Sequence, residues 1–358
     1  MVKHGSYRRI EALTLLVAGL LLAALVAGCG TRGGGAGDGG GENGEKKTYR
    51  IQLSHVVAPE TPKGLAAEKF KELVEKKTDG RVTVEVYPNS ELYGDEDELQ
   101  AIQSGAVQML APTTSKFTTI TPKFQVLDLP FIYDSYEDIP EVTAKDTEVG
   151  KLLYENEDLA KRNTKVLALW VDGLKQFTAN DPIRQPEDFK GLKIRVQPAD
   201  VLRRMFEAWG AKTANISFGE LYSALQQGVV DGHENPYSVI YGSKANEVQD
   251  YLTESNHGAN VSVAVINQDF YDSLPEDLQQ AVTEAAEEAA EYNLEVAEKE
   301  NEEGKQQIID DGGTEVIELS EAERNAFKEV VVPDLWNQFA DEIGPEAVTE
   351  IKEREGSE

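Results

Sequence analysis

The chain has 358 residues, with 65 acidic side chains against 35 basic ones and a formal net charge of −30. Such an excess of negative charge argues against nucleic acid or an anionic membrane surface as a partner. The length suits about two domains of roughly 150 residues each.

Residues 1–28 have the pattern of a bacterial lipoprotein signal peptide. Arg8 and Arg9 form a basic front, residues 13–26 are mostly apolar, and small residues precede Cys29, the only cysteine. A transmembrane anchor with an incidental cysteine is the alternative, but the apolar run is shorter than the ~20 residues that a spanning helix needs. We therefore expect a lipid anchor at Cys29, a flexible glycine-rich tether over residues 29–47, and a body held on the outer side of the membrane. No thiol would then be left for catalysis, a metal or a disulfide.

The first part of the body predicts a parallel sheet with crossover helices. Apolar and β-branched runs indicate strands over residues 49–57, 81–87 and 106–111. Helices are expected between them, one beginning at Thr61 and one over residues 95–103. This alternation of strand and helix is typical of parallel strands joined by crossovers.

A second series of strands and helices follows. Further strands are expected over residues 165–171, 192–197 and 260–266. Asp172-Gly173 reads as a turn after the first of them, and a helix follows the second. No Pro/Gly/Ser-rich linker separates the two series, which favours two lobes that the chain crosses more than once over two independent domains in tandem.

Capping signals place two further helices. Ser217 and Glu220 have the spacing of a capping box, so a helix is expected to begin there. A long acidic helix, capped near Ser273 and Pro275, should reach to about Gly304.

Enzyme motifs are missing from the chain. His55, His233 and His257 follow the signal segment at wide separations and fit no metal-ligand spacing. No Gly-x-Ser-x-Gly elbow, Walker loop, Gly-x-Gly-x-x-Gly turn or EF-hand-like loop occurs, and carboxylate pairs in so acidic a chain are typical of solvated surface. We expect no catalysis, no cofactor and no metal.

Arg195 is the residue that points to a function. It lies within the short apolar strand over residues 192–197, where an unpaired guanidinium is costly to bury. Its partner is either a protein carboxylate or an anion from outside, to which the fork can donate two parallel hydrogen bonds. Asn235 offers a donor and an acceptor, and Lys175 a second positive charge. The aromatic residues that could form walls of a pocket, although each alone is more typical of a core, are Trp170, Phe218 and Tyr222.

Around these residues the chain resembles the solute-binding proteins of tripartite ATP-independent periplasmic (TRAP) transporters. The segments that carry the resemblance are Gly191-Leu192-Lys193-Ile194-Arg195-Val196, the run over residues 220–232, and Glu234-Asn235-Pro236. The resemblance implies that Arg195 pairs with a ligand carboxylate, that Asn235 binds nearby, and that Phe218 closes over the bound acid. His233 stands where the family usually has glutamine, and we expect it to be oriented away from the ligand.

Other segments are similar to the branch that binds C4-dicarboxylates. They are Ser54-His55-Val56-Val57, Thr61-Pro62-Lys63-Gly64, Val86-Tyr87-Pro88-Asn89-Ser90, Asp128-Leu129-Pro130-Phe131, residues 175–180 and residues 248–257. Sialic acid binders usually carry arginine in place of Lys175, which argues against that ligand. The remaining ligand-binding candidates are His55, Thr113 and Lys116.

The resemblance implies an α/β fold of the periplasmic-binding-protein type, with two interleaved lobes, a central ligand cleft and a long helix spanning both lobes. Lobe I would comprise residues 48–172 and 261–300, and lobe II residues 173–260 and 301–358. The bound molecule would be a small organic acid such as succinate, fumarate or malate, delivered to the membrane permease subunits of a TRAP transporter without ATP. The alternatives are another carboxylate, such as a monocarboxylate or keto acid, and a binding protein that serves a receptor as a ligand sensor.

Overall fold

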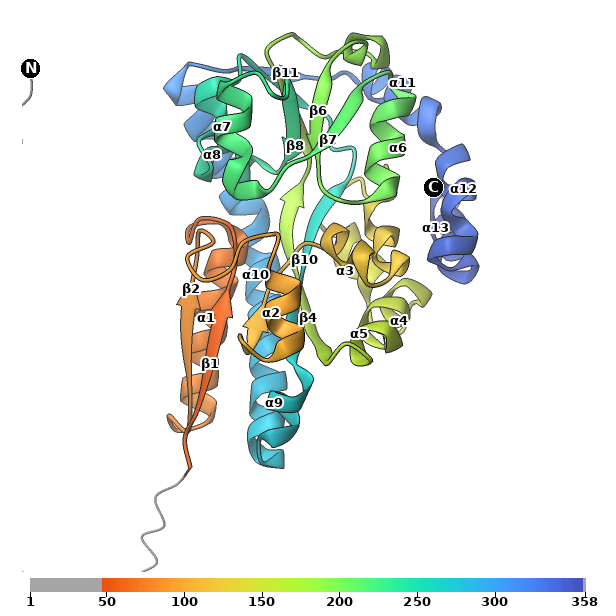
Figure 1. The fold of residues 1–358 in the computed structure, drawn as a ribbon. Helices are drawn as coiled ribbons and strands as arrows, with labels where there is room; N and C mark the ends of the chain where they lie inside the picture. Colours follow the sequence, from red (N-terminus) through yellow and green to blue (C-terminus); the bar gives the residue numbers. More distant parts are fainter. Residues whose placement is uncertain (1–46, 357–358) are drawn as a thin grey trace, which may run out of the picture. The chain divides into compact units, whose positions relative to one another are not determined.

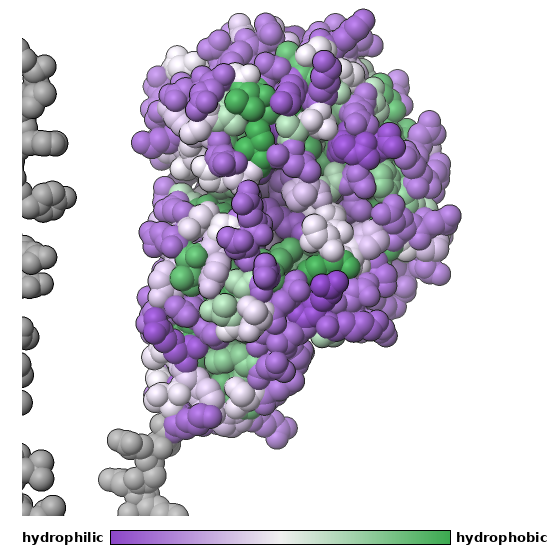
Figure 2. Space-filling model, viewed as in Figure 1, coloured by the Kyte–Doolittle hydropathy of each residue, from purple (hydrophilic) through white to green (hydrophobic). Residues whose placement is uncertain are grey.

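The computed structural model describes residues 47–356, which form one compact unit containing two mixed β-sheets. The expected signal segment and the lipid anchor at Cys29 lie outside the described residues. Among the described helices, none combines the length and apolar character that crossing a membrane requires. Figure 2 shows a mostly hydrophilic face with small hydrophobic patches, in keeping with the acidic composition.

The first sheet belongs to lobe I. Its strands, in spatial order, are β2 (Val82–Tyr87), β1 (Tyr49–Ser54), β3 (Met109–Leu110), β10 (Ala259–Asn267) and β4 (Thr164–Leu174). Strand β1 pairs in parallel with both β2 and β3, which confirms the parallel arrangement expected from the alternating pattern. Helix α1 (Pro62–Lys77) begins at Thr61, whose side chain accepts a hydrogen bond from the backbone N–H of Gly64, as the sequence predicted. The second crossover helix, α2, spans Glu98–Ser104.

The second sheet belongs to lobe II. Its strands, in spatial order, are β11 (Glu315–Glu318), β9 (Tyr251–Glu254), β5 (Gln176–Ala179), β8 (Gly232–Asn235), β6 (Lys193–Val196) and β7 (Lys212–Asn215). All six strands are four residues long, and only β6 was predicted. Strand β6 runs parallel to both β7 and β8.

The chain passes between the two sheets three times. It leaves the first sheet from β4 into β5, returns from β9 into β10, and leaves again from the long helix α10 (Glu276–Asp311) into β11. The two lobes are therefore interleaved, and the alternative of tandem domains is wrong. The expected turn at Asp172-Gly173 is also wrong, because β4 continues through both residues to Leu174 and stays paired with β10.

Helix α10 joins the two lobes. It contacts α1 and β4 of lobe I and α8 (Tyr237–Gly242) of lobe II, and Figure 1 shows it running along both. Its N-cap is Pro275, and it extends beyond the expected end to Gly312, which has a positive φ of 68°. Asn301 in the middle of this helix donates from Nδ2 to the carbonyl of Asp172 at 2.8 Å and accepts from the backbone N–H of Ser238 at 3.0 Å. The helix thus bonds to the backbone of both lobes.

Shorter helices cover the sheets. Those of lobe I and its neighbouring loops are η1 (Thr114–Thr119), η2 (Pro122–Asp128), α3 (Asp138–Thr143), α4 (Glu148–Tyr154), α5 (Glu157–Ala160) and α9 (Gln268–Ser273). Those between the strands of lobe II are η3 (Pro186–Phe189), α6 (Asp200–Ala208), η4 (Phe218–Glu220), α7 (Leu221–Gln226) and η5 (Ala245–Val248). The C-terminal helices are α11 (Glu321–Val331), α12 (Asp334–Ile343) and α13 (Pro345–Glu355), of which α12 contacts both η2 and α6.

Candidate functional site

A pocket lies where the carboxyl ends of the parallel strands of the two sheets face each other. It contains about 370 Å³ of unfilled space, part of it open to solvent. Crevices at the carboxyl ends of strands are the usual ligand sites of open α/β sheets. The polar lining residues are Lys63, Thr113, Lys116, Asp172, Arg195, Gln197, Asn235 and Asn260, and the others are Val56, Val57, Pro112, Phe218 and Val239.

Arg195 reaches this pocket because of the alternation of side chains along β6. Its neighbours Ile194 and Val196 enter the hydrophobic core, so Arg195 points to the opposite face of the sheet. The residue is only 2% exposed, and its Nε donates to the carbonyl oxygen of Ile216 at 2.9 Å. Within residues 47–356, the guanidinium forms no ion pair with a carboxylate, and its two terminal nitrogens have no hydrogen-bond partner.

The electrostatic setting of Arg195 is that of a buried cation. Burial lowers the pKa of its guanidinium, while the negative charges of Asp95 and Glu234 act in the opposite direction. Neither carboxylate is paired with it. An anion in the pocket would therefore meet a desolvated cation whose two terminal nitrogens are free to donate hydrogen bonds.

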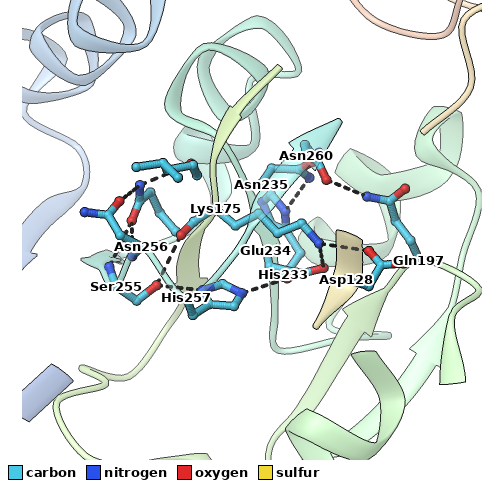
Figure 3. A network of polar contacts seen from close by, with 12 residues as sticks. Asp128, Lys175, Gln197, His233, Glu234, Asn235, Ser255, Asn256, His257 and Asn260 are labelled. Atoms are coloured by element: carbon cyan, nitrogen blue, oxygen red, sulfur yellow. Dashed lines mark hydrogen bonds and ion pairs between the residues drawn. The ribbon is translucent and has the colours of Figure 1, made fainter. Parts of the chain in front are cut away.

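A chain of side-chain hydrogen bonds joins residues of the two sheets at the pocket. Thr113 donates to Oε1 of Gln197, whose Nε2 donates to Oδ1 of Asn260 at 3.0 Å. Asn260 in turn donates to Oδ1 of Asn235 at 3.2 Å, and Nδ2 of Asn235 contacts Nδ1 of His233 at 3.0 Å. Figure 3 shows the part from Gln197 to His233. Each amide is thereby oriented by its neighbour.

His233 ends this chain as a neutral ring. It is fully buried, and burial followed by the charge of Arg195 lowers its pKa to about 3. Because Nδ2 of Asn235 is a donor, Nδ1 of the neutral ring accepts, and the proton lies on Nε2. His233 does not line the pocket; it orients Asn235 from behind.

Two further cations face the pocket from lobe I, and both are paired. Nζ of Lys63, in the first turn of α1, lies 3.4 Å from Oδ2 of Asp172, which also accepts from the hydroxyl of Ser262 at 2.7 Å. Lys116 in η1 forms an ion pair with Asp95. Lys63 is 1% exposed and Lys116 is 7% exposed, so both charges lie in a largely dry environment.

Asp95 connects the two lobes at the rim of the pocket. One of its carboxylate oxygens contacts Lys116, and the other accepts from the backbone N–H of Phe218 at 2.7 Å. Burial works against ionisation here, but Lys116 and the Phe218 hydrogen bond leave the pKa of Asp95 lowered. Phe218 is thus held at the pocket by a residue of the opposite lobe.

Lys175 lies outside the lining of the pocket, in a buried cluster of its own. Its Nζ is 3.1 Å from Oε1 of Glu234 and 3.7 Å from Oδ1 of Asp128. The ring of His257 contacts the other oxygen of Glu234 through Nε2 at 2.8 Å, and Ser115 donates to Asp128 at 2.7 Å. Figure 3 shows Lys175 pointing toward these two carboxylates.

The two carboxylates of this cluster, Glu234 and Asp128, differ in how readily they ionise. Burial opposes ionisation of Glu234, but Lys175 and the hydrogen bond with His257 lower its pKa to about 2. Burial raises the pKa of Asp128 to about 6, against the charge of Lys175. Lys175 therefore has a firm partner in Glu234 and a weaker one in Asp128.

Five of the nine residues expected at the ligand line the pocket, and four do not. The five are Thr113, Lys116, Arg195, Phe218 and Asn235. The other four are His55, buried after β1, Trp170, buried in β4, Lys175 in its ion-pair cluster, and Tyr222, partly buried in α7.

Sequence reasoning missed Lys63, Asp172, Gln197 and Asn260 as lining residues. Lys63 lies in a segment that resembles the C4-dicarboxylate binders, and this resemblance was the one sequence feature that could have pointed to a ligand role for it. Gln197 and Asn260 follow or lie within predicted strands, but only the meeting of the two sheets brings them together. Within residues 47–356 no group of His, Cys, Asp and Glu side chains is arranged to hold a metal ion.

The model of the bacterial extracellular solute-binding proteins of family 7 matches residues 53–342. The chain belongs to this family. The C4-dicarboxylate-binding periplasmic protein DctP of Rhodobacter capsulatus is 45% identical over 84% of this chain and 90% of its own length. A TRAP periplasmic solute-binding protein of Shewanella oneidensis, solved with bound succinate, has a TM-score of 0.80 at 39% identity, over 85% of this chain and 98% of that one. Another from Desulfovibrio salexigens, solved with orotic acid, has a TM-score of 0.79 at 29% identity, over 86% and 98%.

This TRAP solute-binding protein therefore has the two-lobed α/β fold and the extracytoplasmic transport role that the resemblance implied. The relatives also show that one fold holds chemically different acids. The ligand of this chain therefore depends on the residues of its own pocket.

Proposed function

We propose that this solute-binding protein captures a C4-dicarboxylate such as succinate, fumarate or malate. The observation that carries the proposal is Arg195, a buried guanidinium fixed by Nε alone and without a carboxylate partner in the described part of the chain. A ligand carboxylate would accept two hydrogen bonds from its terminal nitrogens. Asn235 lines the same pocket, and its Nδ2 carries a second hydrogen besides the one directed at His233, which it would donate to the bound carboxylate.

The second ligand carboxylate is assigned to Lys63. Lys63 lines the pocket from lobe I, opposite the β6 and β8 residues of lobe II. Lys175 was the sequence-based candidate for this role, but it lies outside the pocket lining and already pairs with Glu234. Lys63 keeps Asp172 and Ser262 behind it, which would hold its ammonium in place while the ligand binds.

Binding is expected to draw the lobes together. Arg195, Asn235 and Phe218 come from lobe II, whereas Lys63, Thr113 and Lys116 come from lobe I. A dianion that contacts both sets has more interactions in the closed state than in an open one, so it shifts the population toward closure. The Asp95–Phe218 hydrogen bond closes the rim in the same movement.

Delivery to a membrane permease and attachment at Cys29 complete the proposal. The family is extracytoplasmic and serves transport. The permease subunits and the lipid anchor are inferred from the family and from the signal pattern before Cys29. No step of chemistry on the ligand is required. A neighbouring histidine kinase gene in place of permease genes would favour the alternative of a ligand sensor.

A thermal-shift screen followed by titration calorimetry tests the ligand. The body from residue 47 onward is mixed with about a hundred organic acids, because ligand occupancy stabilises by RT ln(1 + [L]/Kd), roughly 2.7 kcal/mol at a hundredfold excess. Succinate, fumarate and malate should give the largest shifts. A larger response to orotic acid, a keto acid or a monocarboxylate than to all three would overturn the proposal.

A further inference from the structure

Lys116 stands between two carboxylates at the wall of the pocket. Its Nζ contacts Asp95 and lies 3.7 Å from Oε1 of Glu98. Lys116 lines the pocket, and Glu98 behind it is 1% exposed in α2. Two carboxylates that share one cation in a dry environment do not both ionise readily, because their like charges repel.

The two carboxylates differ in their hydrogen bonds. Asp95 receives the backbone N–H of Phe218 in addition to Lys116, whereas Oε1 of Glu98 is buried without a hydrogen-bond partner in the described part of the chain. The charged groups that face Glu98 are Lys116 in η1, Asp95 before α2 and Lys63 in α1. Burial raises the pKa of Glu98 to about 7, Lys116 opposes this rise, and Asp95 adds to it. Glu98 is therefore the weaker acid of the pair.

The pocket is close to electrically balanced before any ligand enters. Its lining cations are Lys63, Lys116 and Arg195, and the carboxylates near them are Asp172, Asp95 and Glu98. With Glu98 ionised, a dianion would bring two unmatched negative charges into this buried cluster. The ligand would also compete with Glu98 for Lys116, the cation that stabilises ionised Glu98.

We propose that Glu98 takes up one proton from solvent when a dicarboxylate binds and returns it to solvent when the ligand leaves. The proposal rests on the dicarboxylate function proposed above. The proton neutralises Glu98. Lys116 then has Asp95 as its one remaining charged partner among these two carboxylates, and its ammonium can also contact the ligand. No bond of the ligand is made or broken.

The uptake has a defined dependence on pH. Below about pH 7, Glu98 is largely protonated before binding, and affinity does not depend on its titration. Above about pH 7, each binding event has to protonate Glu98, so affinity falls as pH rises, by up to about tenfold per pH unit until the pKa of the complex is reached. The complex should therefore bind most tightly at or below neutral pH, within the range where the ligand stays a dianion.

Other buried groups could in principle accept the proton. Asp172 lines the pocket and burial raises its pKa, but its Oδ2 keeps both Lys63 and the hydroxyl of Ser262 as partners. Asp128 has a raised pKa, but it pairs with Lys175 and Ser115, away from the pocket lining. His55 and His233 are both held neutral by burial, and their pKa values are lowered to about 3. A proton on either histidine would lie beside Lys63 or Arg195, which repel it.

The experiment is titration calorimetry of succinate at pH 8 in buffers of different ionisation enthalpy, such as phosphate, HEPES and Tris. The slope of the observed enthalpy against the buffer enthalpy gives the number of protons taken up. We expect more than about half a proton per succinate for the wild type and near zero for Glu98→Gln, whose affinity should also become flat between pH 7 and 9. Asp128→Asn is the matched control and should keep the uptake.

Two outcomes would overturn the proposal: succinate binding without proton uptake, or uptake that survives Glu98→Gln. A failure of all C4-dicarboxylates to bind would instead overturn the proposed function along with it. Should Glu98→Gln fail to fold, infrared difference spectra of the wild type with ¹³C-labelled succinate decide the matter. A protonated carboxyl band of the protein should appear on binding, and its absence contradicts the proposal.

Discussion

Arg195 donates its Nε hydrogen to the carbonyl oxygen of Ile216 at 2.9 Å, so the guanidinium is held by one edge while its fork stays unpaired. Ile216 lies in the loop between β7 and η4, and Phe218 follows two residues later. The loop that orients the cation thus also places the aromatic residue at the pocket.

Replacing Arg195 with lysine should weaken succinate binding strongly. Lysine lacks both the Nε donor for Ile216 and the planar fork, so it offers a single point charge at the wrong place. The loss should be about 2 kcal/mol or more, which is about 30-fold in Kd by calorimetry. Arg203→Lys on the exposed face of α6 is the control and should bind like the wild type. Near wild-type affinity in Arg195→Lys would remove Arg195 from the site.

Replacing Lys63 with methionine should affect dicarboxylates selectively. The variant loses one charged contact of the ligand, worth about 1.5–3 kcal/mol, and leaves Asp172 without its cation. The double variant Lys63→Met, Asp172→Asn removes the unpaired carboxylate and should recover folding stability without recovering succinate affinity. If the double variant binds succinate normally, Lys63 has only a structural role.

His233 should tolerate glutamine but not leucine. The ring nitrogen Nδ1 accepts from Nδ2 of Asn235, and the amide oxygen of glutamine can accept in the same way, whereas leucine cannot. Succinate affinity should stay within about threefold of wild type for His233→Gln, a change of less than ~1 kcal/mol, and should fall by about tenfold for His233→Leu. Equal affinity of the two variants would show that the hydrogen bond to Asn235 does not matter for binding.

Acid should destabilise the protein through its neutral buried histidines. The pKa values of His55 and His233 are lowered to about 3 in the folded state, against about 6.5 when unfolded. The unfolded state therefore binds more protons below about pH 6.5, and the free energy of unfolding contributed by these rings falls as the pH drops toward 3. Urea unfolding at several pH values should show a smaller acid loss in His233→Gln than in the wild type. An unchanged slope would contradict the lowered pKa of His233.

Lys175 should matter for stability more than for ligand contact. Its removal leaves the carboxylates of Glu234 and Asp128 buried without their cation, which costs about 3–5 kcal/mol. Lys175→Met should therefore lower the urea midpoint markedly, whereas Lys161→Met, in an exposed ion pair, should change stability by less than about 1 kcal/mol. A folded Lys175→Met variant of normal stability that fails to bind succinate would restore the ligand role first assigned to Lys175.

Local sequence patterns determined much of the first lobe. The cap at Thr61 depends only on neighbouring residues, and it is present as predicted. The parallel pairing of β1 with β2 and β3 followed from strands separated by helices. Polar four-residue strands such as β5 and β8 carry no such pattern, because partners far along the chain supply their hydrogen bonds.

The sequence by itself also determined that Arg195 would be a charge within an apolar strand, since the alternation of side chains is a property of the strand alone. Only the tertiary structure decided which charges have partners. Glu234 lies 59 residues from Lys175 and meets it because β5 and β8 pair, while Lys63 reaches the pocket because α1 begins beside the crossing strand β4. Pairing of buried charges depends on contacts between distant segments, and these exist only once the two lobes have formed.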